Sequence, residues 1–295
     1  MSLAARLLRR YLRTSLRGRT RLTFFLARRL RAFQAVPVHI KDHPYVYLDL
    51  RFGYAHQLLW DSPYDAPPRE PDEQSVMRRV VRAGDVAYDI GVHFGFHAAL
   101  LSQLVGERGR VCAFEPNDQL FPSLTRTLAE LPNATLYKHA LSDEERDATL
   151  FVPEDVSMAS LADWTGEQGS TRQLKCRMRR LDDLVERGEA PAPDFVKCDV
   201  EGAELSVFRG ARRTLSREDA PVVLFEVNER AARGFGQEKS AALDFLAGLG
   251  APRYEFFEVR EGGRLEAVER VEADFANVLA VPRTRRSRLA GGVES

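Results

Sequence analysis

The sequence contains few cysteines, no uncharged stretch of 18 or more residues and, in its first 40 residues, no acidic side chain. Its three cysteines, Cys112, Cys176 and Cys198, are scattered and odd in number, which argues against a disulfide framework and favours reduced core residues of a cytoplasmic protein. Because no stretch of about 18 residues lacks charge, we expect no membrane-spanning helix. The apolar segment 22–27 is too short, and too closely flanked by arginine, for a secretory signal.

The charges are unevenly distributed, although the formal net charge of the 295 residues is zero. Residues 1–40 contain ten arginines, so the rest of the chain has 33 basic and 43 acidic side chains and a net charge of −10. Leucine and aromatic residues recur among these arginines at helical spacing, which predicts a basic amphipathic helical segment. We expect residues 1–34 to contact either the inner surface of a membrane or an acidic partner. Packing against the acidic body of the protein is the alternative.

The rest of the chain divides into a connecting region, a large domain and a tail. Residues 41–74 combine a short strand-like stretch with a connection rich in proline and acidic residues. Over residues 75–282, strand and helix patterns alternate, which predicts an α/β fold with a mostly parallel sheet and helices on both of its faces. Two less regular segments, 148–153 and 174–181, are expected to form an antiparallel pair. The tail, residues 283–295, is expected to be disordered.

The end of the first strand of this domain carries the motif DIGVHFG. Gly91 and Gly95 allow the backbone to approach a ligand closely and to turn into a helix. Twenty residues after Gly95, Glu115 ends the next strand, where a carboxylate can accept hydrogen bonds from the ribose of a nucleoside. The spacing G-x-x-x-G differs from the G-x-G-x-x-G of dinucleotide sites and disfavours a nicotinamide-dependent dehydrogenase, which is the alternative enzyme. Asp89 would repel a pyrophosphate but suits S-adenosylmethionine, which carries an ammonium and a sulfonium.

A second group of polar residues lies in the segment DFVKCDVEGAEL. Lys197 and Asp199 are two residues apart on an expected interior strand, so they share a face of the sheet, and a buried lysine needs a partner. Asp199 should end this strand beside the cofactor. Glu201 and Glu204 also fit the first turn of the following helix, where acids are favourable. Glu226, near the end of the next strand, could meet Asp199 across the strand ends.

These motifs, together with FEP, VFRGA and ANVLAVP in this order, resemble the FkbM-type family of class I methyltransferases over about residues 75–282. The resemblance implies a Rossmann-like sheet of seven strands with an antiparallel last strand, S-adenosylmethionine as donor, and transfer to an oxygen in most members. It also implies that the segment 138–143 borders the adenine. The cofactor-binding residues that we expect are Asp89, Gly91, His93, Gly95, Glu115, Ala140 and Leu141.

The two histidines of the first motif have two interpretations. His93 and His97 have the spacing of a helical zinc pair, but zinc proteases have glutamate directly after the first histidine, where this chain has Phe94. Gly95 between them would also weaken a metal-binding helix. The family usually has Ala-Asn where this chain has Val-His, so cofactor affinity or its pH dependence is expected to differ. His97 is expected to be a packing residue.

Methyl transfer to a hydroxyl requires a base or a metal that removes the proton. The expected catalytic residues are Asp199, as the base, with Lys197 and Glu226 beside it. A divalent cation shared by Asp199 and Glu226 is the alternative, although no metal ligands are assigned. The acceptor is expected to be a small-molecule or sugar hydroxyl, selected by residues within 40–75 and 150–175.

A non-catalytic nucleic-acid-binding or membrane-binding module led by the arginine-rich N-terminus is a third possibility. The acidic body of the chain disfavours nucleic acid, because binding to phosphates requires a basic surface. We therefore expect no nucleic-acid partner.

Overall fold

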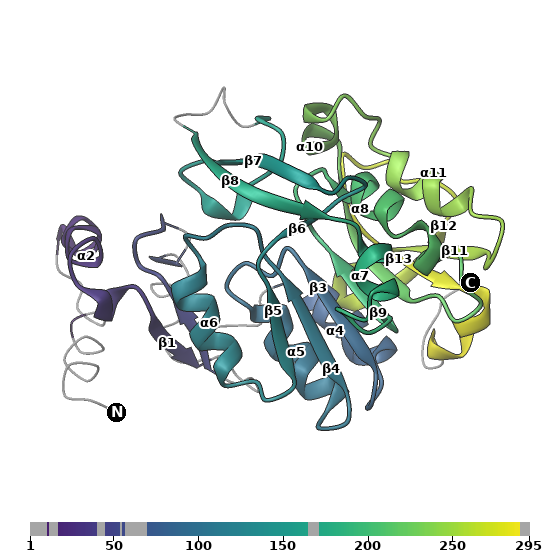
Figure 1. Ribbon diagram of the computed structural model, residues 1–295, viewed down its shortest axis with the longest axis horizontal. Coiled ribbons are helices and arrows are strands. Elements are labelled where there is room, and N and C mark those ends of the chain that lie inside the picture. Colours follow the sequence, from purple (N-terminus) through teal and green to yellow (C-terminus); the bar gives the residue numbers. More distant parts are fainter. Residues whose placement is uncertain are drawn as a thin grey trace.

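The computed structural model describes residue 11 and residues 17–39, 45–53, 55–56, 70–164 and 171–289. An eight-stranded sheet forms its centre, in the order β12-β11-β13-β10-β9-β3-β4-β5 (Figure 1). The strands are β3 (Val86–Ile90), β4 (Arg110–Phe114), β5 (Ala134–Tyr137), β9 (Phe195–Cys198), β10 (Val222–Asn228), β11 (Tyr254–Arg260), β12 (Arg264–Val268) and β13 (Phe275–Pro282).

The strand directions confirm the expected Rossmann-like α/β class. Strands β5, β4, β3, β9 and β10 are parallel to one another. The last strand, β13, lies between β10 and β11 and is antiparallel to both. The expected number of seven strands is wrong, because β12 pairs with β11 as an eighth. The reversal before β12 is made by Gly262 and Gly263, whose φ values of 73° and 71° are easily adopted by glycine.

Helices cover both faces of the sheet, as the alternating pattern indicates. Helices α4 (Pro71–Val80), α5 (Phe96–Val105) and α6 (Phe121–Ala129) enclose one hydrophobic core. Helices α7 (Leu181–Glu186), α8 (Glu204–Gly210), α9 (Arg212–Leu215) and α11 (Ala241–Ala247) enclose the other. Phe195 and Val196, which are successive in β9, point into different cores. This alternation is the period of a strand that is buried on both faces.

A smaller sheet lies above the strand ends in Figure 1 and consists of β6 (Ala140–Leu141), β8 (Arg172–Arg179) and β7 (Arg146–Val152) in that order. Strands β7 and β8 are antiparallel, which confirms the expected pair. The 3₁₀ turn η2 (Val156–Met158) follows β7.

The N-terminal part forms a separate small unit that contacts α6. Helix α2 (Arg19–Ala27) and the 3₁₀ turn η1 (Arg31–Phe33) precede an antiparallel pair, β1 (Val36–His39) and β2 (Tyr45–Leu48). The backbone N–H of Tyr47 donates to Thr127 Oγ1 at 2.9 Å. Residues 1–10 and 12–16 of the expected amphipathic segment lie outside the described residues, as do residues 57–69 of the connection. Helix α4 already begins at Pro71, inside the expected connection, because proline is compatible with the first turn of a helix.

The expected disordered tail is wrong for residues 283–289, which form the 3₁₀ segment η5 (Arg283–Leu289). Arg285 Nη2 donates to Asp194 at 2.9 Å, and Arg288 Nη2 donates to Asp85 at 2.9 Å. These carboxylates belong to loops that precede β9 and β3, so the arginines attach the segment to the body. Among the described residues, no helix has both the length and the apolar character needed to cross a bilayer. Helix α10 (Glu229–Gly234) follows β10 directly.

Candidate active site at the carboxyl ends of the strands

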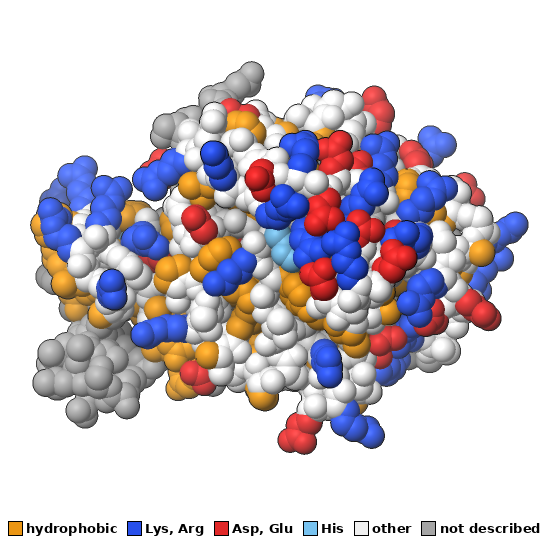
Figure 2. Space-filling model, in the orientation of Figure 1, with side chains coloured by type: hydrophobic (Ala, Val, Ile, Leu, Met, Phe, Trp, Pro, Cys, Tyr) orange, Lys and Arg blue, Asp and Glu red, His pale blue; other side chains and the backbone are white. Residues whose placement is uncertain are grey.

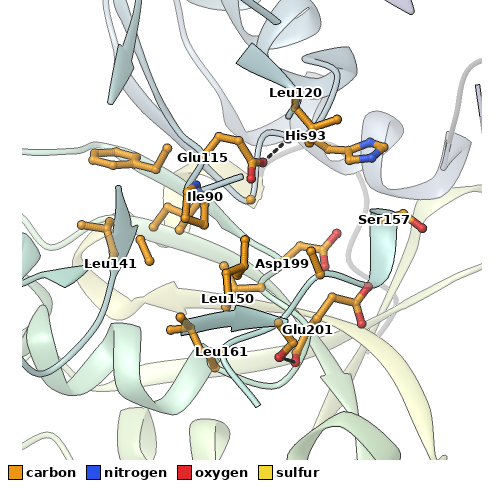
Figure 3. Close-up of a pocket in the computed structure, with 18 of the residues that line it drawn as sticks. Ile90, His93, Glu115, Leu120, Leu141, Leu150, Ser157, Leu161, Asp199 and Glu201 are labelled. Carbon is orange, nitrogen blue, oxygen red and sulfur yellow. Dashed lines mark hydrogen bonds between the residues drawn. The ribbon is translucent and has the colours of Figure 1, made fainter. Parts of the chain in front are cut away.

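A cavity of about 610 Å³, partly open to solvent, lies at the carboxyl ends of β3, β4 and β9. We call it the cofactor cavity, because it lies where ligands bind in open α/β sheets. Figure 3 shows the carboxylates of Glu115, Asp199 and Glu201 directed to one side, with Leu141 and Leu150 on the other. The cavity therefore offers an apolar region and a strongly acidic region to a single ligand.

Glu115 follows β4 and is held in place by two backbone hydrogen bonds. The N–H groups of His93 and Asn117 each donate to one of its carboxylate oxygens at 2.9 Å. Burial raises the pKa of Glu115 to about 7, and the two hydrogen bonds oppose this rise. An ionised carboxylate offers about four acceptor positions, so two remain for a ligand in the cavity. This donor–acceptor balance fits the two hydroxyls of a ribose.

Gly91 and Gly95 have different tasks, although both have left-handed backbone conformations with φ of 86° and 88°. Gly91 lines the cavity, and a Cβ there would lie 1.8 Å from the carbonyl oxygen of Asp199. Gly95 begins α5, and a Cβ there would lie 2.9 Å from Thr127 of α6. The structure thus brings Gly91 to the cavity and uses Gly95 for helix packing.

His93 lines the cavity with its backbone in the left-handed region, at φ 52°. Asparagine and histidine adopt this region more readily than most residues. The usual asparagine of the family and the histidine of this chain therefore fit the same turn. His97 is buried in α5, and its Nε2 lies 3.1 Å from a carboxylate oxygen of Glu70, a position within the protein body that agrees with a packing residue.

Asp89 is fully buried on β3 and is not among the residues that line the cavity. Its neighbour in the register of the sheet is Lys197 on β9. Burial raises the pKa of Asp89 to about 6, and the Lys197 ammonium opposes the rise. The structure places Asp89 behind the cavity wall, where it balances the charge of this lysine.

Lys197 and Asp199 form an ion pair with an Nζ–Oδ2 distance of 2.9 Å. Lys197 is 6% exposed. Burial by itself lowers the pKa of the lysine, but the carboxylates of Asp199 and Asp89 outweigh this and raise it above its ordinary value. The ammonium is therefore charged, and it holds the Asp199 carboxylate at the end of β9. This geometry agrees with the shared strand face expected from the sequence.

A second cavity, of about 430 Å³, adjoins the first at Asp199, which lines both. We call it the acidic cavity, because the charged side chains that line it are Lys197 and four carboxylates: Glu70, Glu73, Asp199 and Glu226. Asn277 of β13 also lines it and donates to Glu73. Burial raises the pKa of Glu226, and the Asp199 carboxylate adds to this rise, so the neutral form of Glu226 is favoured. The three residues expected to be catalytic thus meet in this cavity.

Glu201 is not among the site residues expected from the sequence, yet it lines the cofactor cavity. Its φ is 53°, an uncommon value for glutamate, and Gly202 follows with φ 97°. Burial raises the pKa of Glu201, and the neighbouring Asp199 and Glu226 contribute. Glu204 instead stabilises the turn before α8, because its Oε1 accepts a hydrogen bond from the N–H of Val200 at 3.0 Å. The glycine between the two glutamates was the available signal that this turn is not an ordinary helix start.

Ala140 and Leu141 form β6 and line the cofactor cavity, as the resemblance implies. His139, directly before them, lines it too and was not singled out from the sequence. Its Nε2 is buried and has no hydrogen-bond partner among the described residues. The segment 156–161 closes the same cavity, within the range expected to select the acceptor.

Within the part of the chain that the structure describes, no group of three or more histidine, cysteine or acidic side chains is placed to hold a metal ion. In this part of the chain, no third side chain is placed to complete a zinc site with His93 and His97. Asp199 and Glu226 are two carboxylates beside an ammonium, which is a poor arrangement for a divalent cation.

Comparisons with known proteins agree with this site. Residues 89–261 match the methyltransferase FkbM domain. The hexuronic acid methyltransferase AglP of Haloferax volcanii is 32% identical over 155 residues, which are 51% of this chain and 61% of that protein. The AMB antimetabolite synthetase AmbE of Pseudomonas aeruginosa is 25% identical over 300 residues, which cover 83% of this chain and 14% of that protein. The chain therefore spans less than two thirds of the length of either relative.

Among solved structures, fibrillarin of Aeropyrum pernix with natively bound S-adenosyl-L-methionine has 15% identity and a TM-score of 0.41, covering 71% of this chain and 73% of that one. The match to the family domain extends over more than half of the chain, from the first strand-end motif to the end of β11. It confirms the resemblance found in the sequence and leaves no support for a nicotinamide-dependent dehydrogenase. The chain belongs to the FkbM methyltransferases.

Proposed function

We propose that the protein transfers a methyl group to a hydroxyl oxygen of a small molecule or a sugar. The observation that carries this proposal is the position of Asp199, which borders both the cofactor cavity and the acidic cavity. With the donor in the first cavity and the acceptor in the second, a carboxylate lies where the two would meet. A hydroxyl acceptor needs such a base more than a neutral amine does.

The donor-binding residues follow from the geometry of the cofactor cavity. Glu115 would accept hydrogen bonds from the ribose hydroxyls through its remaining acceptor positions. Leu141 and Leu150 provide the apolar surface that a purine ring requires. Glu201 and Asp199 provide negative charge for the ammonium and sulfonium groups. The residues present therefore fit S-adenosylmethionine.

The bound donor supplies an electrophilic methyl group, and its sulfur leaves as a neutral thioether. The acceptor oxygen forms the new bond to carbon and loses its proton, which we assign to Asp199 as general base. Lys197 fixes the position of this carboxylate through the 2.9 Å ion pair. Glu226 in its neutral form can donate a hydrogen bond to the acceptor. Positioning of the two reactants in adjoining cavities supplies much of the remaining acceleration.

A sugar acceptor is supported by the name of the hexuronic acid methyltransferase relative. The test is transfer of a labelled methyl group from S-adenosylmethionine to a panel of hydroxyl compounds, with the product identified by NMR. We expect an O-methyl product, which Asp199→Asn should form about 10²- to 10⁴-fold more slowly. A product methylated on nitrogen or carbon would contradict the proposal.

We also propose that helix α2 brings the protein to an anionic membrane surface. Thr23 and Ala27 of this helix are buried against the rest of the protein, whereas Leu22 and Phe25 are 46% and 52% exposed. Leu30, just beyond the helix, is 47% exposed. Figure 2 shows hydrophobic and basic side chains together at the left edge, where α2 lies in Figure 1. An exposed apolar surface bordered by arginine suits the interface of an anionic bilayer.

Co-sedimentation with vesicles tests this membrane contact. We expect binding to vesicles of phosphatidylcholine and phosphatidylserine, weaker binding to phosphatidylcholine alone, and a loss in Phe25→Ser. Phe275→Ser, which removes another exposed aromatic side chain far along the sequence, is the matched control and should bind like the wild type. Binding that ignores both lipid charge and Phe25→Ser would refute the contact.

A further inference from the structure

The acidic cavity is built from two parts of the chain. One part lies within the residues that match the family domain and includes Lys197, Asp199 and Glu226. The other part lies outside that match and consists of Glu70, Glu73, Phe275 and Asn277. The residues that this chain adds from outside the family domain are therefore candidates for selecting the acceptor.

Phe275 places an exposed aromatic ring at this cavity. It is the first residue of β13 and pairs with Asn228, the last residue of β10. Because β13 is antiparallel to β10, its first residue lies at the edge of the sheet where the cavity is. Phe275 lines the cavity and is nevertheless 56% exposed. It therefore offers an apolar ring to a ligand at the mouth of the cavity.

Polar groups lie next to this ring, on the same face of β13. Asn277 follows Phe275 by two residues, so both side chains share a face, and Asn277 is the register partner of Glu226 on β10. Asn277 also donates to Glu73 of α4, which is buried. An apolar ring at the mouth and hydrogen-bonding groups inside are complementary to a pyranose, whose C–H groups form an apolar face and whose hydroxyls surround it.

The charges of the cavity disfavour an acidic sugar. Among the described residues that line it, Lys197 is the only cation, and its ammonium is shared by Asp199 and by Asp89 behind the wall. A carboxylate on the acceptor would find no unbalanced positive charge and would lie near Glu70 and Glu73. Two like charges about 10 Å apart, at an effective dielectric constant of about 20, weaken binding by more than about 10-fold.

We propose that the acceptor is an uncharged sugar whose ring stacks on Phe275 and whose reacting hydroxyl reaches Asp199. Asn277 and Glu73 would bind neighbouring hydroxyls of the same ring. This proposal rests on the proposed function, because it places the acceptor in the acidic cavity. An acidic sugar is the class of substrate that the cavity rejects.

Binding of the acceptor, measured without methyl transfer, tests the proposal. The probes are the methyl glycosides of glucose, galactose and mannose and of the corresponding hexuronic acids. Each is titrated by NMR into protein saturated with S-adenosylhomocysteine. We expect at least one neutral glycoside to bind, and the matching hexuronic acid to bind more than about 10-fold more weakly.

Replacing the aromatic ring tests the stacking contact. Phe275→Ala should weaken the neutral glycoside about 3- to 10-fold, because covering the exposed half of the side chain gives roughly half the free energy of burying a phenylalanine. Phe275→Tyr keeps a ring and should recover most of the affinity. Phe25→Ser is the matched control, because Phe25 is 52% exposed and lines neither cavity.

Reversing one charge tests the rejection of acids. Glu70→Lys should narrow the difference in affinity between the hexuronic acid and the neutral glycoside by about 10-fold or more. Glu107→Lys changes an exposed acid between α5 and β4 that lines neither cavity, and it should keep the wild-type difference. If Glu70→Lys does not fold, as judged by circular dichroism, the wild-type comparison of the two sugars decides the question of charge.

Three results would overturn the proposal: no binding of any neutral glycoside, equal affinity for a hexuronic acid and its neutral counterpart, or full affinity in Phe275→Ala. Each of these would leave the proposed function intact if an O-methyl product is still formed from another hydroxyl compound. A glycoside that binds as expected but receives its methyl group on carbon would refute the proposed function alone.

Discussion

Replacing Asp199 by asparagine should separate catalysis from binding and from stability. The asparagine would keep the shape and an acceptor oxygen for the Lys197 ammonium, now 2.9 Å from Asp199, but would lose the base. Loss of a general base lowers the rate by about 10²- to 10⁴-fold, and we expect this fall in kcat. The affinity for S-adenosylmethionine should change by a smaller factor, because Glu115 and the apolar wall remain.

The stability cost can be derived from the same ion pair. Lys197 is 6% exposed, so losing its charged partner leaves a buried ammonium less compensated. Removing one partner of a fully buried pair costs about 3–5 kcal/mol. Here the Asp199 side chain is 28% exposed and Asp89 faces the same lysine, so we expect about 1–3 kcal/mol, the range for an unsatisfied buried group. Urea denaturation measures this difference.

The assay is single-turnover transfer of labelled methyl at saturating donor, with calorimetry for donor affinity. Asp194→Asn is the matched control, because Asp194 precedes the same strand at its other end and pairs with Arg285 at 2.9 Å. It should cost stability but leave kcat unchanged. If Asp199→Asn has full kcat and unchanged donor binding, Asp199 takes no part in catalysis and our assignment of a general base at the end of β9 is wrong. If saturating donor restores its rate, Asp199 binds the ammonium of the donor instead of acting as a base.

Three further outcomes are expected. Glu115→Gln should weaken S-adenosylmethionine by about 10- to 150-fold in calorimetry, the worth of hydrogen bonds to a charged group, and an unchanged affinity would remove Glu115 from the ribose site. Gly91→Ala should be far more destabilising in thermal unfolding than Gly84→Ala, because both glycines have positive φ but only Gly91 would meet backbone, at 1.8 Å; equal effects would contradict the close approach of β3 and β9. The donor-free protein should lose stability between about pH 4.5 and pH 7, because the raised pKa values of Asp89 and Glu115, about 6 and about 7, let the folded state keep protons that the unfolded state releases. Each group should contribute about 3 kcal/mol to this loss, and a stability that rises over this range in urea denaturation would show that the buried acids are better compensated than their surroundings indicate.

The sequence was informative where a local pattern determines the geometry. The period of two in a strand places Lys197 and Asp199 on one face, and the structure has them 2.9 Å apart. The parallel order of β3, β4 and β9 brings Gly91 and Glu115 to one edge, because all carboxyl ends of a parallel sheet lie there. Both features are determined either by sequence patterns that extend over no more than about 30 residues or by the general topology of α/β folds.

Features that depend on distant partners were not visible in the sequence. The arginines of η5 resemble a solvated tail until Asp85 and Asp194 are brought beside them by the fold. His139 appears in the sequence as an ordinary strand-end residue, and only the folded structure shows that it lines the cofactor cavity. Glu201 was hidden because its left-handed backbone turns the side chain into the cavity, whereas a regular first helical turn would direct it elsewhere. The division of the acids between two cavities likewise needs the complete sheet.

The most direct test of the account is a crystal structure of the protein with S-adenosylhomocysteine. The account predicts that the ribose hydroxyls lie within hydrogen-bonding distance of Glu115, with the base at Ala140 and Leu141 and the sulfur facing Asp199. If S-adenosylhomocysteine occupies the acidic cavity, or if it makes no contact with Glu115, the assignment of the two cavities is wrong. The catalytic role of Asp199, which depends on that assignment, would then be contradicted as well.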